Sequence, residues 1–265
     1  MDVLPLPLPA DTCNKLYIVS IGPGAADLLT DRARHALAES SHIIGNALYL
    51  DQIASFIGDR TVIRSRMGEE VDRTREAVRL AADHVVSMVS GGDAGIYGMA
   101  SIAVEFIDRH RLDVELEVVP GVTSAFSAAA LLGSPLSGDC VIASLSDLLV
   151  PWEEIARRLD LAFRMGVPVA LYNPRSRGRP GNFARAVAIA RRHLPPDTPV
   201  GVVRDAERDG GTVRVTTLDR VMEIEEQVDM HTIVIIGGRE SRLWRGGDHV
   251  RGIITPRGYH RKYEY

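Results

Sequence analysis

Short apolar runs alternate with amphipathic segments along most of the chain. Runs rich in valine and isoleucine, such as residues 15–21 and 85–90, have the length and composition of buried parallel strands. Between them, apolar residues recur at helical spacing: in residues 72–82, Ala77 and Val78 fall on one side of a helix and Arg73 on the polar side. This alternation predicts an α/β fold, in which helices cover mostly parallel sheets.

The alternation continues long enough to predict two consecutive α/β domains, residues 15–121 and 122–245, each a mostly parallel or mixed sheet flanked by helices. The first has predicted strands at 15–21, 42–44, 61–64, 85–90 and 115–119, and helices at 31–39, 47–57, 72–82 and 98–111. The second has predicted strands at 140–144, 167–172, 200–204, 212–216 and 232–236, and helices at 125–132, 151–165, 182–193 and 218–227. Strand 212–216 is a candidate for antiparallel pairing.

Two terminal segments fall outside these domains. Residues 1–14 contain three prolines and lack the basic region of a signal peptide, so we expect a disordered extension. Residues 246–265 are basic and aromatic, and we expect a partly disordered tail.

The most informative stretch is the loop that follows strand 85–90. It begins Gly91-Gly92-Asp93, and further glycines follow at 95 and 98, so a carboxylate stands where the backbone is little shielded. A strand, a glycine-rich loop and a helix in this order build ligand sites at the carboxyl ends of strands in open α/β sheets. The alternative is that Asp93 merely caps the following helix.

Similar loops follow several other predicted strands. Because the carboxyl ends of parallel strands meet at one edge of a sheet, we expect these loops to converge on a large site. The loops are 22–24, 91–93, 120–124, 172–176, 204–205 and 237–239. Thr123 and Ser124 offer hydroxyl and N–H groups at the start of a helix, although the alanine-rich helix is equally explained by close packing.

The first loop, Gly22-Pro23-Gly24, departs from the dinucleotide fingerprint Gly-x-Gly-x-x-Gly. Asp27 takes the place of the third glycine, and Pro23 removes one backbone N–H from a phosphate cradle. A pyrophosphate site is therefore disfavoured, and the loop suits a flat or uncharged group that lies against bare backbone.

Composition narrows the function classes. Of 265 residues, 45% are hydrophobic and 25% charged, which is typical of an ordinary globular protein. The net charge of −4 gives no basic footprint for nucleic acid, and no apolar run is long enough to cross a membrane. Two cysteines without metal or redox spacing, and no histidine pair at ligand spacing, predict a reducing cytoplasm and no metal site.

Two further loops carry charged side chains. Arg175, Arg177 and Arg179 form a basic run in an otherwise acidic chain, suited to bidentate binding of carboxylates. The alternative is a solvated surface loop. Asp147 follows strand 140–144 and fits the role of a helix cap as well as that of a catalyst.

Together these loops resemble the tetrapyrrole (corrin/porphyrin) methyltransferases, over residues 16–239. The marks are Gly22-Pro23-Gly24, Gly91-Gly92-Asp93, Pro120–Ser124 and Gly237-Gly238. Within that superfamily the chain looks most like the precorrin-3B C(17)-methyltransferase group, on residues 90–99, 144–152 and 172–176. Ala94 stands where that group usually has proline.

The resemblance implies two α/β domains with the active site in the cleft between them, S-adenosylmethionine as cofactor, a homodimer and a tetrapyrrole substrate. It implies methylation of carbon 17 of precorrin-3B, with ring contraction to precorrin-4. The alternatives are cobalt-factor III as substrate or, further off, another precorrin or uroporphyrinogen-III. The absence of cysteines for an iron–sulfur cluster favours the metal-free route.

The resemblance also distributes roles among the loop residues. The cofactor candidates are Pro23, Gly91, Gly92, Asp93, Ile96, Thr123, Ser124, Asn173, Asp205 and Gly237. The substrate candidates are Gly24, Gly121, Arg175, Arg177 and Arg204, and the candidate bases for ring contraction are Asp147, Tyr172 and Tyr97. Two other classes remain as hypotheses: an NAD(P)-dependent oxidoreductase, which the glycine pattern disfavours, and a non-catalytic tetrapyrrole or nucleotide carrier.

Overall fold

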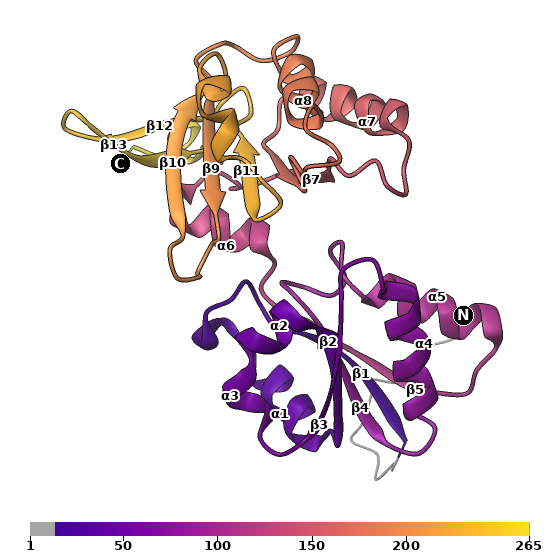
Figure 1. The fold of residues 1–265 in the computed structure, drawn as a ribbon. Coiled ribbons are helices and arrows are strands. Elements are labelled where there is room, and N and C mark those ends of the chain that lie inside the picture. The colour runs from indigo at the N-terminus through magenta and orange to yellow at the C-terminus, as the bar shows by residue number, and fades with distance from the viewer. Residues whose placement is uncertain (1–13, 265) are drawn as a thin grey trace. The chain divides into compact units, whose positions relative to one another are not determined.

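A computed structural model describes residues 14–264, so the predicted extension lies, except for residue 14, outside the described residues. The chain divides into two compact units, of which the first ends at Thr123 and the second begins at Ser124. This division falls two residues after the predicted domain boundary (Figure 1).

Unit 1 is built on a five-stranded sheet in the order β3-β2-β4-β1-β5, with every pairing parallel. Its strands are β1 (Lys15–Ser20), β2 (His42–Asn46), β3 (Thr61–Ser65), β4 (Val85–Ser90) and β5 (Glu115–Val119). One face packs against α1 (Asp31–Glu39), α2 (Ala47–Gln52) and α3 (Ala54–Ile57), and the other against α4 (Glu70–Leu80) and α5 (Ala100–His110) (Figure 1). The predicted helix 47–57 is therefore two helices, separated at Ile53.

Local sequence accounts for much of this unit. Thr30 is the N-cap of α1, and its side chain accepts a hydrogen bond from the Ala33 N–H, as its sequence position predicts. Arg73 of α4 was expected on the polar side of the helix but is only 5% exposed. Its guanidinium donates to Ser65 Oγ at the end of β3 and reaches Met99 Sδ, so tertiary contacts override the helical pattern.

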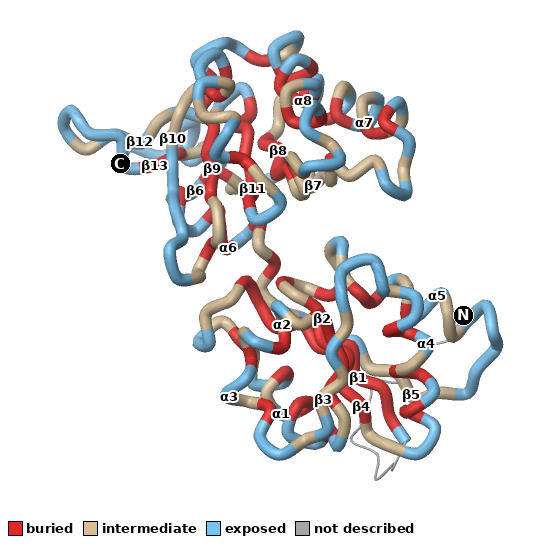
Figure 2. Tube along the Cα trace, in the orientation of Figure 1, coloured by how far each residue is buried: buried red, intermediate tan, exposed pale blue. Residues whose placement is uncertain are grey.

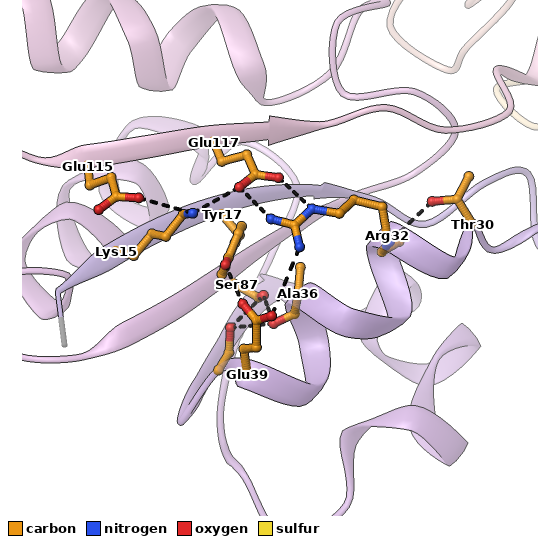
Figure 3. A network of polar contacts seen from close by, with 11 residues as sticks. Lys15, Tyr17, Thr30, Arg32, Ala36, Glu39, Ser87, Glu115 and Glu117 are labelled. Atoms are coloured by element: carbon orange, nitrogen blue, oxygen red, sulfur yellow. Dashed lines mark hydrogen bonds and ion pairs between the residues drawn. The ribbon is translucent and has the colours of Figure 1, made fainter. Parts of the chain in front are cut away.

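A polar network joins α1 to the edge strand β5 (Figure 3). Lys15, 4% exposed, pairs with Glu115 and Glu117 at 3.0 and 2.9 Å, and Arg32 of α1 pairs with Glu117 through two nitrogens. Burial alone would raise the pKa of Glu117, but the hydrogen bonds from Arg32 and Lys15 lower it overall. Burial would lower the pKa of Lys15, whereas its two glutamates raise it.

Unit 2 has a mixed five-stranded sheet in the order β10-β9-β11-β8-β7. The strands are β7 (Val141–Ser144), β8 (Val169–Tyr172), β9 (Pro199–Arg204), β10 (Thr212–Thr217) and β11 (Thr232–Ile236). β10 is antiparallel to β9, as the sequence suggested, but β11 is also antiparallel to both of its neighbours. One face packs against α7 (Trp152–Met165), α8 (Asn182–Ala190) and η2 (Val221–Gln227), a 3-10 helix, and the other against α6 (Ser124–Leu131). The buried strands of both sheets stand out in Figure 2.

The predicted C-terminal tail is wrong in its first part. β12 (Arg242–Gly246) and β13 (His249–Ile254) form a hairpin across the expected boundary at residue 246. β13 also pairs in parallel with the two-residue strand β6 (Gly133–Ser134), and Ile253 is fully buried. A 3-10 turn, η3 (Tyr259–Arg261), follows. Residues 249–254 are ordered because β13 pairs with the backbone that follows α6 and buries Ile253.

Candidate functional site

The carboxyl ends of β1 and β4 are joined directly in unit 1. The Gly22 N–H donates to the Gly92 carbonyl at 3.0 Å, and the Gly92 N–H donates to the Gly22 carbonyl at 2.8 Å. The chain leaves β1 toward α1 and leaves β4 toward α5, which cover opposite faces, so this is the switch point where open α/β sheets bind ligands. The two predicted loops therefore do meet.

Asp93 joins this pair of loops to a third one. Its Oδ1 accepts from the Gly95 N–H at 2.8 Å, and its Oδ2 accepts from the Gly121 N–H, which follows β5, at 2.9 Å. Because α5 begins only at Ala100, Asp93 is not its cap. Both carboxylate oxygens thus bind the protein's own backbone.

Gly121 is required here by close packing. A Cβ at this position would lie 2.6 Å from Ser20 Cβ and 2.8 Å from the Gly92 carbonyl oxygen. Ser20, which the sequence analysis did not single out, also accepts a hydrogen bond from the Ala94 N–H at 2.8 Å. The absence of a side chain at Gly121 admits Ser20 and Gly92, and its role toward a substrate stays a prediction.

These contacts occupy four backbone donors that a phosphate bound at this edge could otherwise use. The N–H groups of Gly22, Gly92, Ala94 and Gly121 all point to acceptors within unit 1. A pyrophosphate binds in such loops through N–H groups that are free to receive it. The geometry therefore disfavours the dinucleotide hypothesis and fits a cofactor without phosphate.

The remaining candidates of this edge differ in exposure. Pro23 and Thr123 are buried, Ile96 is half-buried and Tyr97 is 56% exposed. Gly91 packs against the ring of Tyr49, and its Cβ would lie 2.6 Å from that ring. Gly24, with a φ of 152°, has a backbone conformation that favours glycine.

In unit 2, β7, β8 and β9 run in the same direction, so their carboxyl ends share one edge. The Asn173 side chain after β8 donates to Ser144 Oγ at the end of β7, at 3.0 Å. Tyr172 Oη accepts from the Ala125 N–H in the first turn of α6, at 2.9 Å. These bonds join the candidates Asn173 and Tyr172 to two further elements.

Backbone strain marks the same loops. Tyr97, Asn173 and Asp205 have φ values of 53°, 51° and 49°. A side chain in this region costs about 1–3 kcal/mol, less for Asn and Asp, and such residues cluster at functional sites. Among the described residues only two other non-glycine residues share it: Glu207 in the loop after β9, and Arg111, which ends α5.

Gly237 does not belong to this edge. Because β11 is antiparallel to β8 and β9, its carboxyl end lies beside their amino ends. The Gly237 N–H donates to the carbonyl of Pro199, the first residue of β9, and a Cβ on Gly238 would lie 2.3 Å from the Gly166 carbonyl oxygen. The expectation that this loop converges with Asn173 and Asp205 is wrong, since it assumed a parallel strand.

The three arginines of the basic run have different environments. Arg175 pairs with the exposed Glu226 at 3.3 Å, and Arg177 is exposed. Arg179 is the most constrained: its guanidinium donates to Ser146 Oγ at 2.7 Å and lies 3.8 Å from Asp147. Its Nε is buried without an acceptor among the described residues. Arg179 thus links the loop after β8, in which it lies, to the loop after β7 that carries Asp147.

Arg204 belongs to an acidic cluster. It pairs with Asp229 at 2.9 Å and with Asp205 at 3.1 Å, while His231 lies 3.2 Å from Asp205. Burial would raise the pKa of Asp229, but Arg204 and the neighbouring hydrogen bonds lower it. The charge of Arg204 is therefore already balanced by two carboxylates of the protein, which makes it a weaker candidate for binding a carboxylate of the substrate. His231 follows no predicted strand, so strand-end reasoning did not select it.

No group of three or more His, Cys, Asp or Glu side chains among residues 14–264 is placed to hold a metal ion. Within that range, no helix is long and apolar enough to cross a membrane.

Residues 15–221 match the family model of the tetrapyrrole (corrin/porphyrin) methylases. The chain therefore belongs to that family, whose members are S-adenosylmethionine-dependent methyltransferases. A probable cobalt-factor III C(17)-methyltransferase from Salmonella typhimurium is 41% identical over 92% of this chain and 99% of its own length. A precorrin-3B C(17)-methyltransferase from Sinorhizobium sp is 39% identical over 92% and 96%.

Another relative is longer than this chain. The cobalamin biosynthesis protein CbiHC of Archaeoglobus fulgidus is 45% identical over 94% of this chain, which spans 54% of its length. Among solved structures, the methyltransferase CobJ matches with a TM-score of 0.85 and 32% identity, over 92% of this chain and all of its own. A Thermus thermophilus uroporphyrin-III C-methyltransferase complexed with S-adenosylhomocysteine matches with a TM-score of 0.66 and 25% identity, over 84% and 92%.

Proposed function

We propose that this chain methylates carbon 17 of a cobalamin-precursor tetrapyrrole and promotes contraction of its ring. The proposed substrate is precorrin-3B, with cobalt-factor III as the alternative. Relatives with these two activities match nearly end to end. The uroporphyrin-III enzyme is less similar in structure, with a TM-score of 0.66 against 0.85 for CobJ, which disfavours uroporphyrinogen-III as the substrate.

The strand-end loops fit S-adenosylmethionine as the cofactor. It carries no phosphate, so it does not need the N–H groups that Gly22, Gly92 and Gly121 have already used. The observation that supports a ligand site here is the strained backbone of Tyr97, Asn173 and Asp205. Residues with such conformations cluster at functional sites, and these three lie in loops at the strand ends where α/β sheets bind ligands. Pro23, Gly91, Asp93, Ile96, Thr123 and Ser124 remain cofactor candidates.

The chain's contribution to methyl transfer is orientation. When bound, S-adenosylmethionine supplies a methyl group already activated on a sulfonium sulfur. The loops then need to hold the donor in line with carbon 17, and such positioning supplies about 7–11 kcal/mol of barrier lowering. The hydrogen bonds among Gly22, Gly92, Asp93 and Gly121 give unit 1 a rigid edge suited to this task.

Ring contraction requires removal of a proton from a substrate hydroxyl. Tyr172 Oη accepts a hydrogen bond from the Ala125 N–H, which fixes the position of the phenol group at the carboxyl end of β8. Asp147 lies beside Arg179, and Tyr97 is exposed on its loop. These three remain the candidate acid and base groups. Arg175 and Arg177 are candidates for the carboxylates of the substrate, which a net negative protein attracts only through a local basic patch.

Turnover with both substrates tests the proposal. Purified protein is incubated with methyl-labelled S-adenosylmethionine and either precorrin-3B or cobalt-factor III, and the products are analysed by absorbance and mass. We expect label at carbon 17 of one substrate. Binding of a tetrapyrrole without label transfer would instead support the carrier hypothesis. The homodimer and the cytoplasmic location remain predictions, and sedimentation velocity measures the first.

A further inference from the structure

Two adjacent leucines in the loop after β7 are unusually exposed. Leu148 is 78% and Leu149 is 90% exposed, more than any other large apolar side chain among the described residues. In the same loop Leu145 is fully buried, and Trp152 at the start of α7 is 8% exposed. Of the apolar side chains in and beside this loop, Leu145 and Trp152 are buried, whereas Leu148 and Leu149 are exposed to solvent.

The loop is held in this conformation from two sides. Arg179 donates to Ser146 Oγ, and the Ser146 N–H donates to Ser144 Oγ at 3.2 Å. The buried Asn182 side chain donates to the Leu145 carbonyl at 2.8 Å. Since the flanking backbone is fixed, the exposure of the leucine pair is a built feature of the surface.

The position of the pair indicates what covers it. The loop follows β7 on the edge that carries Asn173 and Tyr172, and Ser144 bonds to both Ser146 and Asn173. Arg179 binds the loop directly. An exposed apolar pair on a loop that is held by the Arg179 guanidinium matches a molecule with a flat apolar centre and a periphery of carboxylates.

We propose that Leu148 and Leu149 form a subsite for the apolar face of the tetrapyrrole ring, with Arg179 as the residue that positions them. This inference rests on the proposed function and names a specificity-determining element of the same site. A second copy of the chain is the less suited occupant, because two leucines supply far less than the about 800 Å² per partner of a stable interface.

Binding of uroporphyrin, a flat tetrapyrrole with peripheral carboxylates, tests the subsite directly. We compare the wild-type protein with Leu148→Ser, Leu149→Ser and the double variant, by absorbance titration. Met165→Ser is the matched control, since Met165 is 65% exposed and lies at the end of α7, before the strand β8 begins. S-adenosylhomocysteine affinity, thermal stability and sedimentation are measured for every variant, and KM for the methylated substrate wherever the wild type turns over.

The expected result is a loss of uroporphyrin affinity of about tenfold in the double variant, or an equal rise in KM at unchanged kcat. S-adenosylhomocysteine affinity and the control should stay within twofold. Unchanged tetrapyrrole affinity and KM overturn the subsite while wild-type turnover still upholds the proposed function. A change of oligomeric state in the leucine variants also overturns it, in favour of a second copy. A wild-type protein that neither binds nor methylates a tetrapyrrole refutes both.

Discussion

The carboxyl edges of the two sheets are built in different ways. In unit 1 the sheet is wholly parallel, so the loops at Gly22, Gly92 and Gly121 reach the same edge. Gly22 and Gly92 bond to each other through their backbones, and the Gly121 N–H bonds to the Asp93 side chain of the Gly92 loop. In unit 2 the sheet is mixed, and only β7, β8 and β9 bring their ends together. Those loops are held by side chains, among them Asn173 and Arg179.

This difference indicates that the two edges have different roles in the site. Backbone pairing leaves little freedom for loops to vary, which suits a constant part of a site, such as the place of a cofactor shared by a family. Loops held by side chains can change with few substitutions, which suits recognition of a substrate that differs between relatives. The following predictions test that comparison.

The largest effect is expected at Gly121. In Gly121→Val the new Cβ overlaps Ser20 and Gly92, and such overpacking costs about 3 kcal/mol or more in this confined position. Turnover should be lost with it. Urea unfolding measures the free energy, and Gly178→Val, with no atom within 4 Å of its added Cβ, is the control. Normal stability and kinetics at Gly121→Val would show that the loops are not interlocked.

Asp93→Ala should destabilise the same edge of unit 1, but less than Gly121→Val does. The Gly121 N–H loses its acceptor, which costs about 1–3 kcal/mol of stability. S-adenosylhomocysteine affinity should fall more than tenfold, measured by calorimetry, because Asp93 fixes two of the candidate loops. Asp59→Ala, an exposed position, is the control. Lost stability with intact affinity would limit Asp93 to a structural role.

Glu117→Gln tests the stability of unit 1 without changing the loops at the carboxyl ends of its strands. Glu117 bonds to both Lys15 and Arg32, so its replacement should cost about 1–3 kcal/mol at pH 7. Since the folded pKa of Glu117 is lowered, this contribution is complete above the ordinary glutamate range and is lost as the pH falls through the folded pKa. In urea titrations, the difference in stability between the two proteins should therefore shrink as the pH is lowered below the ordinary glutamate range. A difference that persists at the acid end would contradict the ionic origin.

In unit 2, Arg179→Gln should raise the tetrapyrrole KM about tenfold, with S-adenosylhomocysteine affinity within threefold. The variant loses its hold on Ser146 and Asp147, and such charged contacts contribute about 1.5–3 kcal/mol. Arg177→Gln removes an exposed arginine of the same loop without touching Ser146 or Asp147, so it should raise KM less than Arg179→Gln does. Equal effects of the two substitutions would show that only net charge matters in this loop.

The smallest effect is expected at the opposite edge. Ser241→Ala removes the acceptor of the Gly238 N–H and should cost about 1 kcal/mol of stability. Because the Gly237 loop lies beside the amino ends of β8 and β9, cofactor affinity should stay within twofold. A tenfold loss in calorimetry would restore Gly237 to the cofactor site.

Features that depend on local sequence were predicted well. The strands of both sheets, the Thr30 cap and the strand-end position of the glycine loops all follow from short stretches of chain. In unit 1 those signals sufficed, because parallel strands send every loop to one edge. The roles assigned to the candidate residues stay predictions, to be settled by the substitutions above.

Features that depend on distant partners were missed. The direction of β11 is set by its pairing with β8 and β9, so its sequence did not show that Gly237 turns away. Arg73 is buried by Ser65 and Met99, which helical periodicity does not register. Residues 249–254 were assigned to a basic and aromatic tail, because their partner strand β6 lies more than 100 residues earlier in the chain.

The pairing of β13 with β6 also orders events during synthesis. Unit 1 has all its strands once residue 119 has been made, and can fold while translation continues. In unit 2 the segment after α6 stays uncovered until Ile253 emerges, because the Ile253 N–H donates to the Leu132 carbonyl at 2.7 Å. The fully buried Leu132 and Ile253 are thus among the first and last parts of this unit to leave the ribosome. For most of its translation, unit 2 therefore leaves the backbone after α6 without its partner strand.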